Sequence, residues 1–260
     1  MKDLFSIPLY HENILDADCG DGRKVRDVNQ SVIDDCTSYH LARKENLGDT
    51  DTTHQVLMRT GSQHDMNGEF IKDPPGVCTC MDPVQEWPAL ERAITREVTN
   101  YVNSISKFSR LKKEGDWFNY TWFSVFERED TYPWHDHNLY FVSCVYYPTE
   151  GPGNMPILFK SPISSLINTW WPGPTFGHPE VNRWNQEIMI YPKKGDLIIF
   201  PSWLEHTVNK AGHGLSEAPK FTEMSFGHAQ TIQHDTNDDP YRISISGNYG
   251  VKEVIDGFPK

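Results

Sequence analysis

The sequence has no long apolar run and no concentration of positive charge. No hydrophobic stretch approaches the roughly 20 residues that a membrane-spanning helix needs, and the first residues hold no apolar segment of signal-peptide length. Acidic residues outnumber basic ones by 36 to 24, which gives a formal net charge of -12. No stripe of lysine and arginine is present that would neutralise phosphates. We therefore expect a cytoplasmic protein that binds neither a membrane nor nucleic acid.

Cysteine is scarce, and its spacing suits neither a disulfide framework nor a zinc finger. The chain has five cysteines, an odd number, which is more typical of a reducing compartment. Cys78 and Cys80 form the one close pair, and no second pair or His-x-x-x-His motif accompanies it. Ordinary loop residues are the favoured interpretation of this pair.

The size and composition fit one globular domain. Hydrophobic residues make up 37% of the chain and aromatic residues 12%, which is enough for a buried core despite a mean hydropathy of -0.59. A length of 260 residues suits one β-barrel or sandwich with insertions. We therefore predict a single domain over residues 1–260.

The first part of the chain, residues 1–116, is predicted to hold helices and an irregular wrap around the core. Apolar residues recur at helical spacing over 24–45 and more clearly over 87–108. Residues 48–88 are rich in Gly, Asp, Thr and Pro and follow neither the helical nor the strand period, which predicts a long irregular excursion.

After Gly115 the pattern changes to short runs of β-branched and aromatic residues. Helices followed by many short strands predict a mainly β core with flanking α-helices. We place this core at 117–250, with insertions near 160–187 and 210–240. The predicted strands are Tyr120–Phe126, Tyr140–Tyr147, Ile188–Tyr191, Asp196–Phe200, Phe221–Phe226 and Arg242–Ile245.

Three histidines stand out as candidate metal ligands. In an extended segment alternate side chains face the same way, so His135 and His137 can point at one ion while Asp136 points away. His206 follows a buried strand and a Pro-Ser turn about seventy residues later. Two ligands close in sequence and one distant is how a β-barrel builds a metal site with open positions.

A further element places an arginine and a serine on one face of a strand, at Arg242 and Ser244. The guanidinium fork of an arginine can bind a carboxylate through two parallel hydrogen bonds, and a serine hydroxyl can donate another. This pair is what a dicarboxylate co-substrate requires.

The motif order H-x-H, then G-D-L-I-I-F-P-S-W-L-x-H-x-V, then R-I-S-I-S resembles a subgroup of 2-oxoglutarate/Fe(II) oxygenases of bacteria and phages. The opening residues 4–10 and the strand at 143–147 are also similar to that subgroup, and the resemblance is dense over 117–248. It departs from the wider superfamily, which usually shows H-x-D, and 35 residues separate His206 from Arg242.

The resemblance implies a double-stranded β-helix, the jelly-roll or cupin-like fold, with Fe(II) on His135, His137 and His206. It also implies that 2-oxoglutarate chelates the iron through its C1 carboxylate and C2 keto oxygens. Arg242 and Ser244 would hold the C5 carboxylate. The implied activity is a hydroxylation of a small-molecule or peptide substrate that consumes O2 and converts 2-oxoglutarate to succinate and carbon dioxide.

Several alternatives stay open at this stage. A bulge at the start of the strand would turn Asp136 toward the ion in place of His137. Arg242 would instead pair with a surface acid in so acidic a chain. A cupin-type dioxygenase with three histidines and no 2-oxoglutarate is the second functional hypothesis, and a non-catalytic barrel with a structural metal is the third. The identity of the substrate and the oligomeric state are not readable from the sequence.

Overall fold

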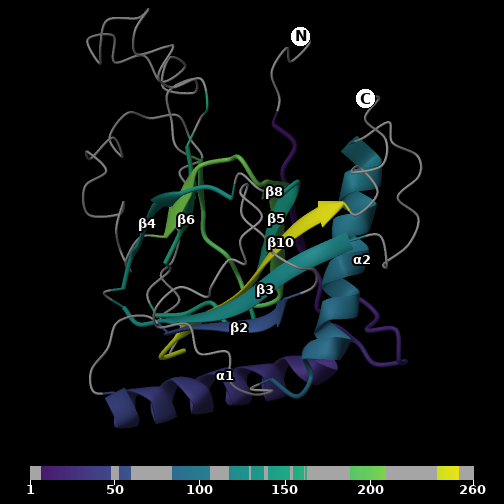
Figure 1. The fold of residues 1–260 in the computed structure, drawn as a ribbon. Coiled ribbons are helices and arrows are strands. Elements are labelled where there is room, and N and C mark those ends of the chain that lie inside the picture. Colours follow the sequence, from purple (N-terminus) through teal and green to yellow (C-terminus); the bar gives the residue numbers. More distant parts are fainter. Residues whose placement is uncertain are drawn as a thin grey trace, which may run out of the picture.

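The computed structural model of the protein describes residues 7–47, 53–59, 84–105, 117–128, 130–137, 140–152, 155–160, 162, 188–208 and 239–251. Within these residues two helices accompany ten strands (Figure 1). Neither of the two described helices is long and apolar enough to cross a bilayer. The elements are β1 (Tyr10–Asn13), α1 (Val25–Leu47), β2 (Thr53–Arg59), α2 (Trp87–Ile105), β3 (Trp117–Phe126), β4 (Tyr132–His135), β5 (Val142–Tyr146), β6 (Ile157–Phe159), β7 (Ile188–Ile190), β8 (Asp196–Pro201), β9 (His206–Val208) and β10 (Arg242–Val251).

The strands form two antiparallel sheets. The major sheet has the order β1-β8-β5-β10-β3-β2, and the minor sheet has the order β4-β9-β6-β7. From β3 onward the chain passes back and forth between them: β3, β5, β8 and β10 belong to the major sheet, whereas β4, β6, β7 and β9 belong to the minor one. This winding is that of a double-stranded β-helix, so the predicted fold class is confirmed.

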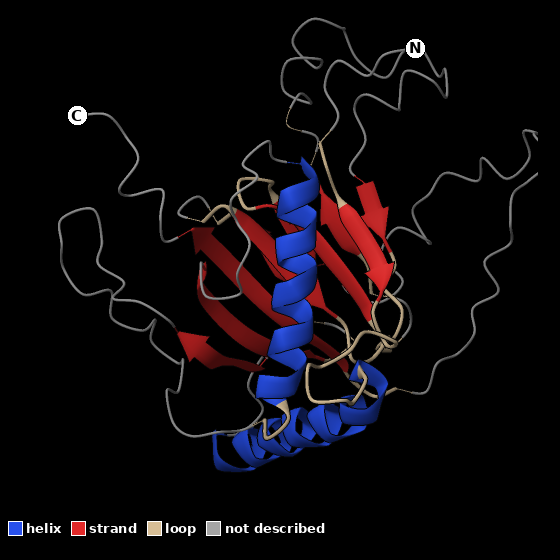
Figure 2. Cartoon of the chain, turned by 90° about the vertical axis from the view of Figure 1, so that its right-hand side faces the viewer, coloured by secondary structure: helices blue, strands red, loops and turns tan. Residues whose placement is uncertain are grey.

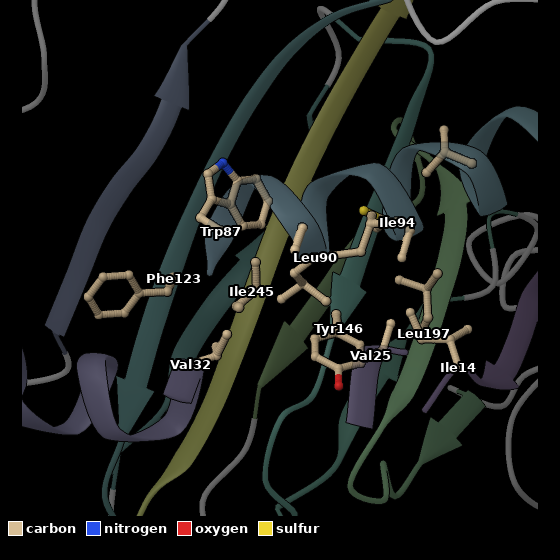
Figure 3. Packing of buried hydrophobic residues seen from close by; sticks show 14 of the residues in the cluster. Ile14, Val25, Val32, Trp87, Leu90, Ile94, Phe123, Tyr146, Leu197 and Ile245 are labelled. Atoms are coloured by element: carbon tan, nitrogen blue, oxygen red, sulfur yellow. The ribbon is translucent and has the colours of Figure 1, made fainter. Parts of the chain in front are cut away.

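Helix α2 covers the outer face of the major sheet, on the side away from the minor sheet (Figures 1 and 2). Leu90, Ile94 and Val98 recur every four residues and therefore share one face of the helix, and all three are buried. They pack with residues of α1 and of the sheet in one apolar cluster, part of which Figure 3 shows. Each such side chain contributes on the order of 1.5–3 kcal/mol to folding.

A second, smaller apolar cluster fills the space between the two sheets. The residues of β8 are apolar on both faces because the strand packs against both clusters. Leu197 and Ile199 face the helices, whereas Ile198 and Phe200 face the minor sheet. From the minor sheet, Phe159 packs against Phe200 with ring centroids 4.9 Å apart. Phe159 and Phe200 of this cluster also lie against the His206 ring, with ring centroids 6.0 Å and 4.8 Å from it.

Strand β10 has one apolar and one polar face. Ile243, Ile245 and Tyr249 belong to the cluster under the helices. The alternate positions face the interior between the sheets, and they are polar and buried throughout: Arg242, Ser244, Ser246 and Asn248. A row of buried polar side chains facing the interior of a barrel is costly to folding unless the side chains have hydrogen-bonding partners.

Two elements of the N-terminal part were not expected. Strand β1 pairs with β8, and β2 pairs with β3 with a register shift near Val56, so both extend the major sheet at its edges. The predicted irregular excursion over 48–88 is therefore wrong for Thr53–Arg59. Edge strands are held largely by backbone hydrogen bonds to one neighbour, and they need no alternating apolar pattern.

Other sequence predictions have mixed outcomes. Both predicted helices are present, and α2 is described as far as Ile105. The predicted strand at 221–226, the pair Cys78 and Cys80, and nearly all of the two predicted insertions lie outside the described residues.

Candidate metal centre

The register of the minor sheet brings two of the three histidines face to face. His135 ends β4 and His206 begins β9, and these two residues are direct cross-strand partners. Their ring centroids lie 4.2 Å apart, and the His137 ring lies 5.0 Å from His135 and 5.2 Å from His206. One ligand nitrogen from each ring falls within 4.8 Å of the others. The structure therefore gathers the three predicted ligands into one group.

Two of these rings are oriented by the backbone next to them. His135 Nδ1 lies 2.9 Å from the carbonyl oxygen of Pro133, and His206 Nδ1 lies 2.9 Å from that of Leu204. A carbonyl oxygen can only accept a hydrogen bond, so each Nδ1 carries the proton and donates it. The lone pair of each neutral ring is then on Nε2, which is the atom free to bind a metal.

The third ring contacts the major sheet instead. His137 follows the end of β4, and its backbone N–H donates to the carbonyl of Ser202 at 2.8 Å. Its Nδ1 lies 3.2 Å from Nδ2 of Asn248 on β10. The ring also packs near Trp122 of β3, with centroids 5.8 Å apart. His137 is thus the one histidine of the group whose ring contacts a side chain of β10.

All three imidazoles are kept neutral. Burial lowers the pKa of His206 to about 3 and that of His137 to about 4, and the nearby His135 adds to both shifts. The pKa of His135 is lowered as well, chiefly by burial. A neutral imidazole is the form that binds a metal, so protons do not compete for these nitrogens near pH 7.

The donor set fits Fe(II) or another imidazole-binding transition metal, and three protein ligands leave positions open for substrate and oxygen. Asp136 is exposed and is not part of the group, so the geometry favours His137 over Asp136 as the third ligand. The register shift within β4 does lie next to this point, between Tyr132 and His135. The described residues thus offer a centre with no carboxylate ligand.

Arg242 lies on the interior face of β10 that also holds Asn248, the neighbour of His137. Its side chain is fully buried, and its guanidinium lies over the rings of Tyr147, at 4.9 Å, and Phe126, at 5.8 Å. One terminal nitrogen donates to the Tyr147 hydroxyl at 3.0 Å. The Nε and Nη1 atoms are buried without a hydrogen-bond partner among the described residues. A buried, permanently charged fork with unused donors fits an anionic ligand such as a carboxylate.

Ser244 occupies the next position on that face of β10 and is 5% exposed. It is the register partner of Ser124 on β3. The structure therefore places Arg242 and Ser244 on one strand face, as the alternation predicted. The idea that Arg242 pairs with a surface acid does not fit its complete burial.

Sequence reasoning missed two contacts of this site, those of Asn248 with His137 and of Tyr147 with Arg242. The signal for Asn248 was present, because it lies six residues after Arg242 on the same strand and therefore on the same face. Nothing in the local sequence marked Tyr147, whose partner is 95 residues away.

Comparison with solved structures finds distant likenesses. The chain is 14% identical to a prolyl-4-hydroxylase of Pseudomonas putida, with 95% of this chain and 94% of that chain covered and a TM-score of 0.47. The chain is 12% identical to AviO1 of Streptomyces viridochromogenes Tue57, with 95% of this chain and 91% of that chain covered and a TM-score of 0.48. A prolyl hydroxylase of Trichoplax adhaerens, in complex with a hypoxia inducible factor peptide, is 11% identical to the chain. The match covers 96% of this chain and 87% of that chain, with a TM-score of 0.41. Likenesses of this extent leave the substrate open.

Comparison at the sequence level is more specific. A search of curated proteins finds no match. A family described as "Putative 2OG-Fe(II) oxygenase" matches residues 120–216, a segment that runs from β3 past β9 and contains His135, His137 and His206. Over residues 120–216, which hold the three histidines, the chain is therefore similar to a family of 2-oxoglutarate- and Fe(II)-dependent oxygenases.

Proposed function

We propose that the protein is an Fe(II)- and 2-oxoglutarate-dependent oxygenase that hydroxylates a second substrate. The observation that carries this proposal is the buried guanidinium of Arg242, whose Nε and Nη1 have no hydrogen-bond partner among the described residues. It lies on the interior strand face that also holds Asn248, the neighbour of His137. The described part of the chain supplies no salt-bridge partner for this buried charge, and an anionic co-substrate would offset the cost of burying it.

In this proposal His135, His137 and His206 hold the iron through their Nε2 atoms. Bound iron would activate O2 and couple oxidative decarboxylation of 2-oxoglutarate, to succinate and carbon dioxide, to hydroxylation of the second substrate. The protein itself contributes three neutral, hydrogen-bonded imidazoles and a site with open positions.

Arg242 and Ser244 would hold the C5 carboxylate of 2-oxoglutarate. Nη1 has no partner among the described residues and Nη2 gives one N–H to Tyr147, so the edge formed by Nη1 and the second N–H of Nη2 can hold the two oxygens of a carboxylate. Each charge-assisted hydrogen bond is worth about 1.5–3 kcal/mol. Tyr147 steadies the guanidinium by accepting one hydrogen bond from Nη2 and by offering its ring face. The co-substrate is thereby oriented from the end opposite the iron.

A second candidate is a dioxygenase that uses the three histidines without 2-oxoglutarate. The donor set favours it, because the described group has no carboxylate. Arg242 disfavours it, because a reaction without a dicarboxylate gives no reason to bury a charge whose Nε and Nη1 have no partner among the described residues. A structural zinc site is a weaker proposal, since such sites usually have four protein ligands and the described group has three.

The primary substrate is proposed only as a small molecule or a peptide, and the location as the cytoplasm. No nucleic-acid partner is proposed, because the chain carries a formal net charge of -12.

The test is turnover of 2-oxoglutarate by the iron-loaded protein, measured as succinate formed and O2 consumed. Because the primary substrate is not identified, the readout is the slow reaction of 2-oxoglutarate with O2 in its absence. We expect succinate from the wild type and none from His206→Ala. Arg242→Ala should raise the KM for 2-oxoglutarate about 100-fold or more, as expected when two charged hydrogen bonds are lost. O2 consumption without succinate would favour the second candidate.

A further inference from the structure

The three histidines are held in two different ways. His135 and His206 each donate to a carbonyl two residues earlier, so their orientation is local. The ring of His137 instead contacts the side chain of Asn248, which is 111 residues away and on the other sheet. We infer that Asn248 is a positioning residue that fixes the tautomer and ring orientation of His137 and so sets the metal affinity; this inference rests on the metal-binding part of the proposed function.

A closed circuit of hydrogen bonds surrounds Asn248, which is 4% exposed. Its Oδ1 accepts from the hydroxyl of Ser143, its register partner on β5, at 2.8 Å. The Ser143 hydroxyl lies 2.9 Å from that of Ser202, which directly follows β8. The carbonyl of Ser202 accepts from the backbone N–H of His137 at 2.8 Å, and the His137 ring returns to Asn248. His137 is thus held by its backbone and by its ring at once.

The chemistry of metal binding decides which way the amide must face. A metal on Nε2 of His137 requires a proton on Nδ1, and that proton needs an acceptor. The amide of Asn248 has an acceptor oxygen on one branch and donor hydrogens on the other. With its NH2 group toward His137 it favours the tautomer that carries its proton on Nε2, which cannot bind a metal through that atom. With its oxygen toward His137 it favours the metal-binding tautomer.

The surrounding hydroxyls allow both orientations. When the amide oxygen faces His137, the NH2 group faces Ser143, whose hydroxyl oxygen can accept and whose proton can pass to Ser202. Rotating the Asn248 amide by 180° therefore reverses the direction of its hydrogen bonds with His137 and Ser143, and both ends of the amide keep a hydrogen-bond partner. Neither Leu nor Ala at this position offers an acceptor to the histidine.

The position of Asn248 also ties the metal to the strand that would bind the co-substrate. Asn248 and Arg242 lie six residues apart on the same face of β10. The strand is paired along its length with β3 and over 245–249 with β5, which makes it one of the best-anchored strands of the sheet. A metal ligand fixed to β10 is therefore held in register with Arg242.

The experiment measures Zn(II) affinity of the full chain, by competition with a chromophoric chelator, in four proteins. Asn248→Ala should weaken binding about 10- to 100-fold, the usual effect of losing a partner that orients a ligating histidine. Asn248→Asp should retain or exceed the wild-type affinity, because a carboxylate accepts the Nδ1 proton of His137. Asn29→Ala is the matched control: Asn29 is 2% exposed and also makes two side-chain hydrogen bonds, to Pro148 and Tyr146, neither of which belongs to the histidine group. It should lower stability and leave Zn(II) affinity unchanged.

A second measurement does not depend on metal affinity and reports directly on the tautomer of the His137 ring. In the Zn(II)-loaded protein with 15N-labelled histidine, we expect all three imidazoles to carry Nδ1 protons, each protected from exchange. In Asn248→Ala the Nδ1 proton of His137 should exchange rapidly while those of His135 and His206 stay protected.

The outcomes separate this inference from the proposed function. Equal Zn(II) affinity and equal protection of the His137 proton in wild type and Asn248→Ala would overturn the positioning role alone. An equal loss of affinity in Asn29→Ala would also overturn it, since the effect would then be one of general stability. A wild type that binds no metal would overturn both, and a metal-binding wild type that never consumes 2-oxoglutarate would overturn the proposed function alone.

Discussion

His135 and His206 are direct partners across β4 and β9, and their ring centroids lie 4.2 Å apart. Because side chains of a strand alternate between two faces, a slip of one residue in this pairing would turn one of the two rings away from the site. The site therefore depends on the register of a short strand pair, and the buried Phe200, packed on His206 at 4.8 Å, helps to hold that register.

The first prediction concerns the third ligand. Asp136→Ala should leave one metal per chain with nearly unchanged affinity, because Asp136 is exposed and outside the histidine group. His137→Ala should weaken binding by more than the 10- to 100-fold expected for an orienting partner alone, since a ligand is lost. Metal content after dialysis distinguishes the two. The reverse pattern would make Asp136 the ligand.

The second prediction concerns the pH dependence of stability in the metal-free protein. The folded pKa of His137 is lowered to about 4, whereas an unfolded histidine titrates near 6.5. Between these pH values the unfolded chain binds more protons than the folded chain. The contribution of neutral His137 to the free energy of unfolding is therefore complete above pH 6.5 and is lost as the pH falls toward 4. It amounts to at most about 1.4 kcal/mol per pH unit.

Urea unfolding at pH 7.5, 6 and 5 measures this dependence. His137→Gln should show a shallower fall in the free energy of unfolding than the wild type, because one titrating ring is gone. Identical slopes would mean that the folded protein does not depress the pKa of this histidine.

The third prediction is that Arg242 is kept at a cost to stability. In the absence of 2-oxoglutarate, Arg242→Met should raise the free energy of unfolding by about 1 kcal/mol, because it fills a similar volume and removes a buried charge whose Nε and Nη1 find no partner in the described structure. The same variant should lose the rise in Tm that 2-oxoglutarate gives the metal-loaded wild type. Arg242→Lys retains the charge and serves as the control. Destabilisation of several kcal/mol by Arg242→Met would show that the guanidinium is a structural element.

The fourth prediction uses two glycines with positive φ. Gly151, at φ +81°, leaves no room for a Cβ, which would lie 2.3 Å from the Cβ of Arg242. Gly22, at φ +87°, has nothing within 4 Å of that position. An alanine at either position costs about 1–2 kcal/mol in backbone strain. Only Gly151→Ala should also displace Arg242 and raise the KM for 2-oxoglutarate, so an unchanged KM in both variants would contradict the close packing of Arg242.

The parts of the fold that were predictable are those that carry strong periodic patterns. Helix α2 shows one apolar face, and β8 is a continuous apolar run bounded by a turn at Gly195, so each was recognisable alone. Strands β1 and β2 were not predicted, because an edge strand needs little apolar surface of its own. Their place depends on an exposed sheet edge formed by distant residues.

The site likewise has features that could be predicted from the sequence and features that could not. The H-x-H spacing and the lead-in to His206 indicated three ligands because each signal is local. The contact of Asn248 with His137 depends on where the chain goes after β4 and on the register of β10, which no local pattern reveals. The burial of Arg242 is likewise a product of the two sheets together, although its type and strand position were readable.

The central claim is that 2-oxoglutarate binds between the histidine-held iron and Arg242. Its most direct test is anaerobic titration of the Fe(II)-loaded protein with 2-oxoglutarate, following the visible charge-transfer band of a 2-oxo acid chelated to Fe(II). We predict that the band appears and saturates in the wild type and needs a far higher concentration in Arg242→Ala. An iron-replete wild type that develops no band at any concentration of 2-oxoglutarate would contradict the account.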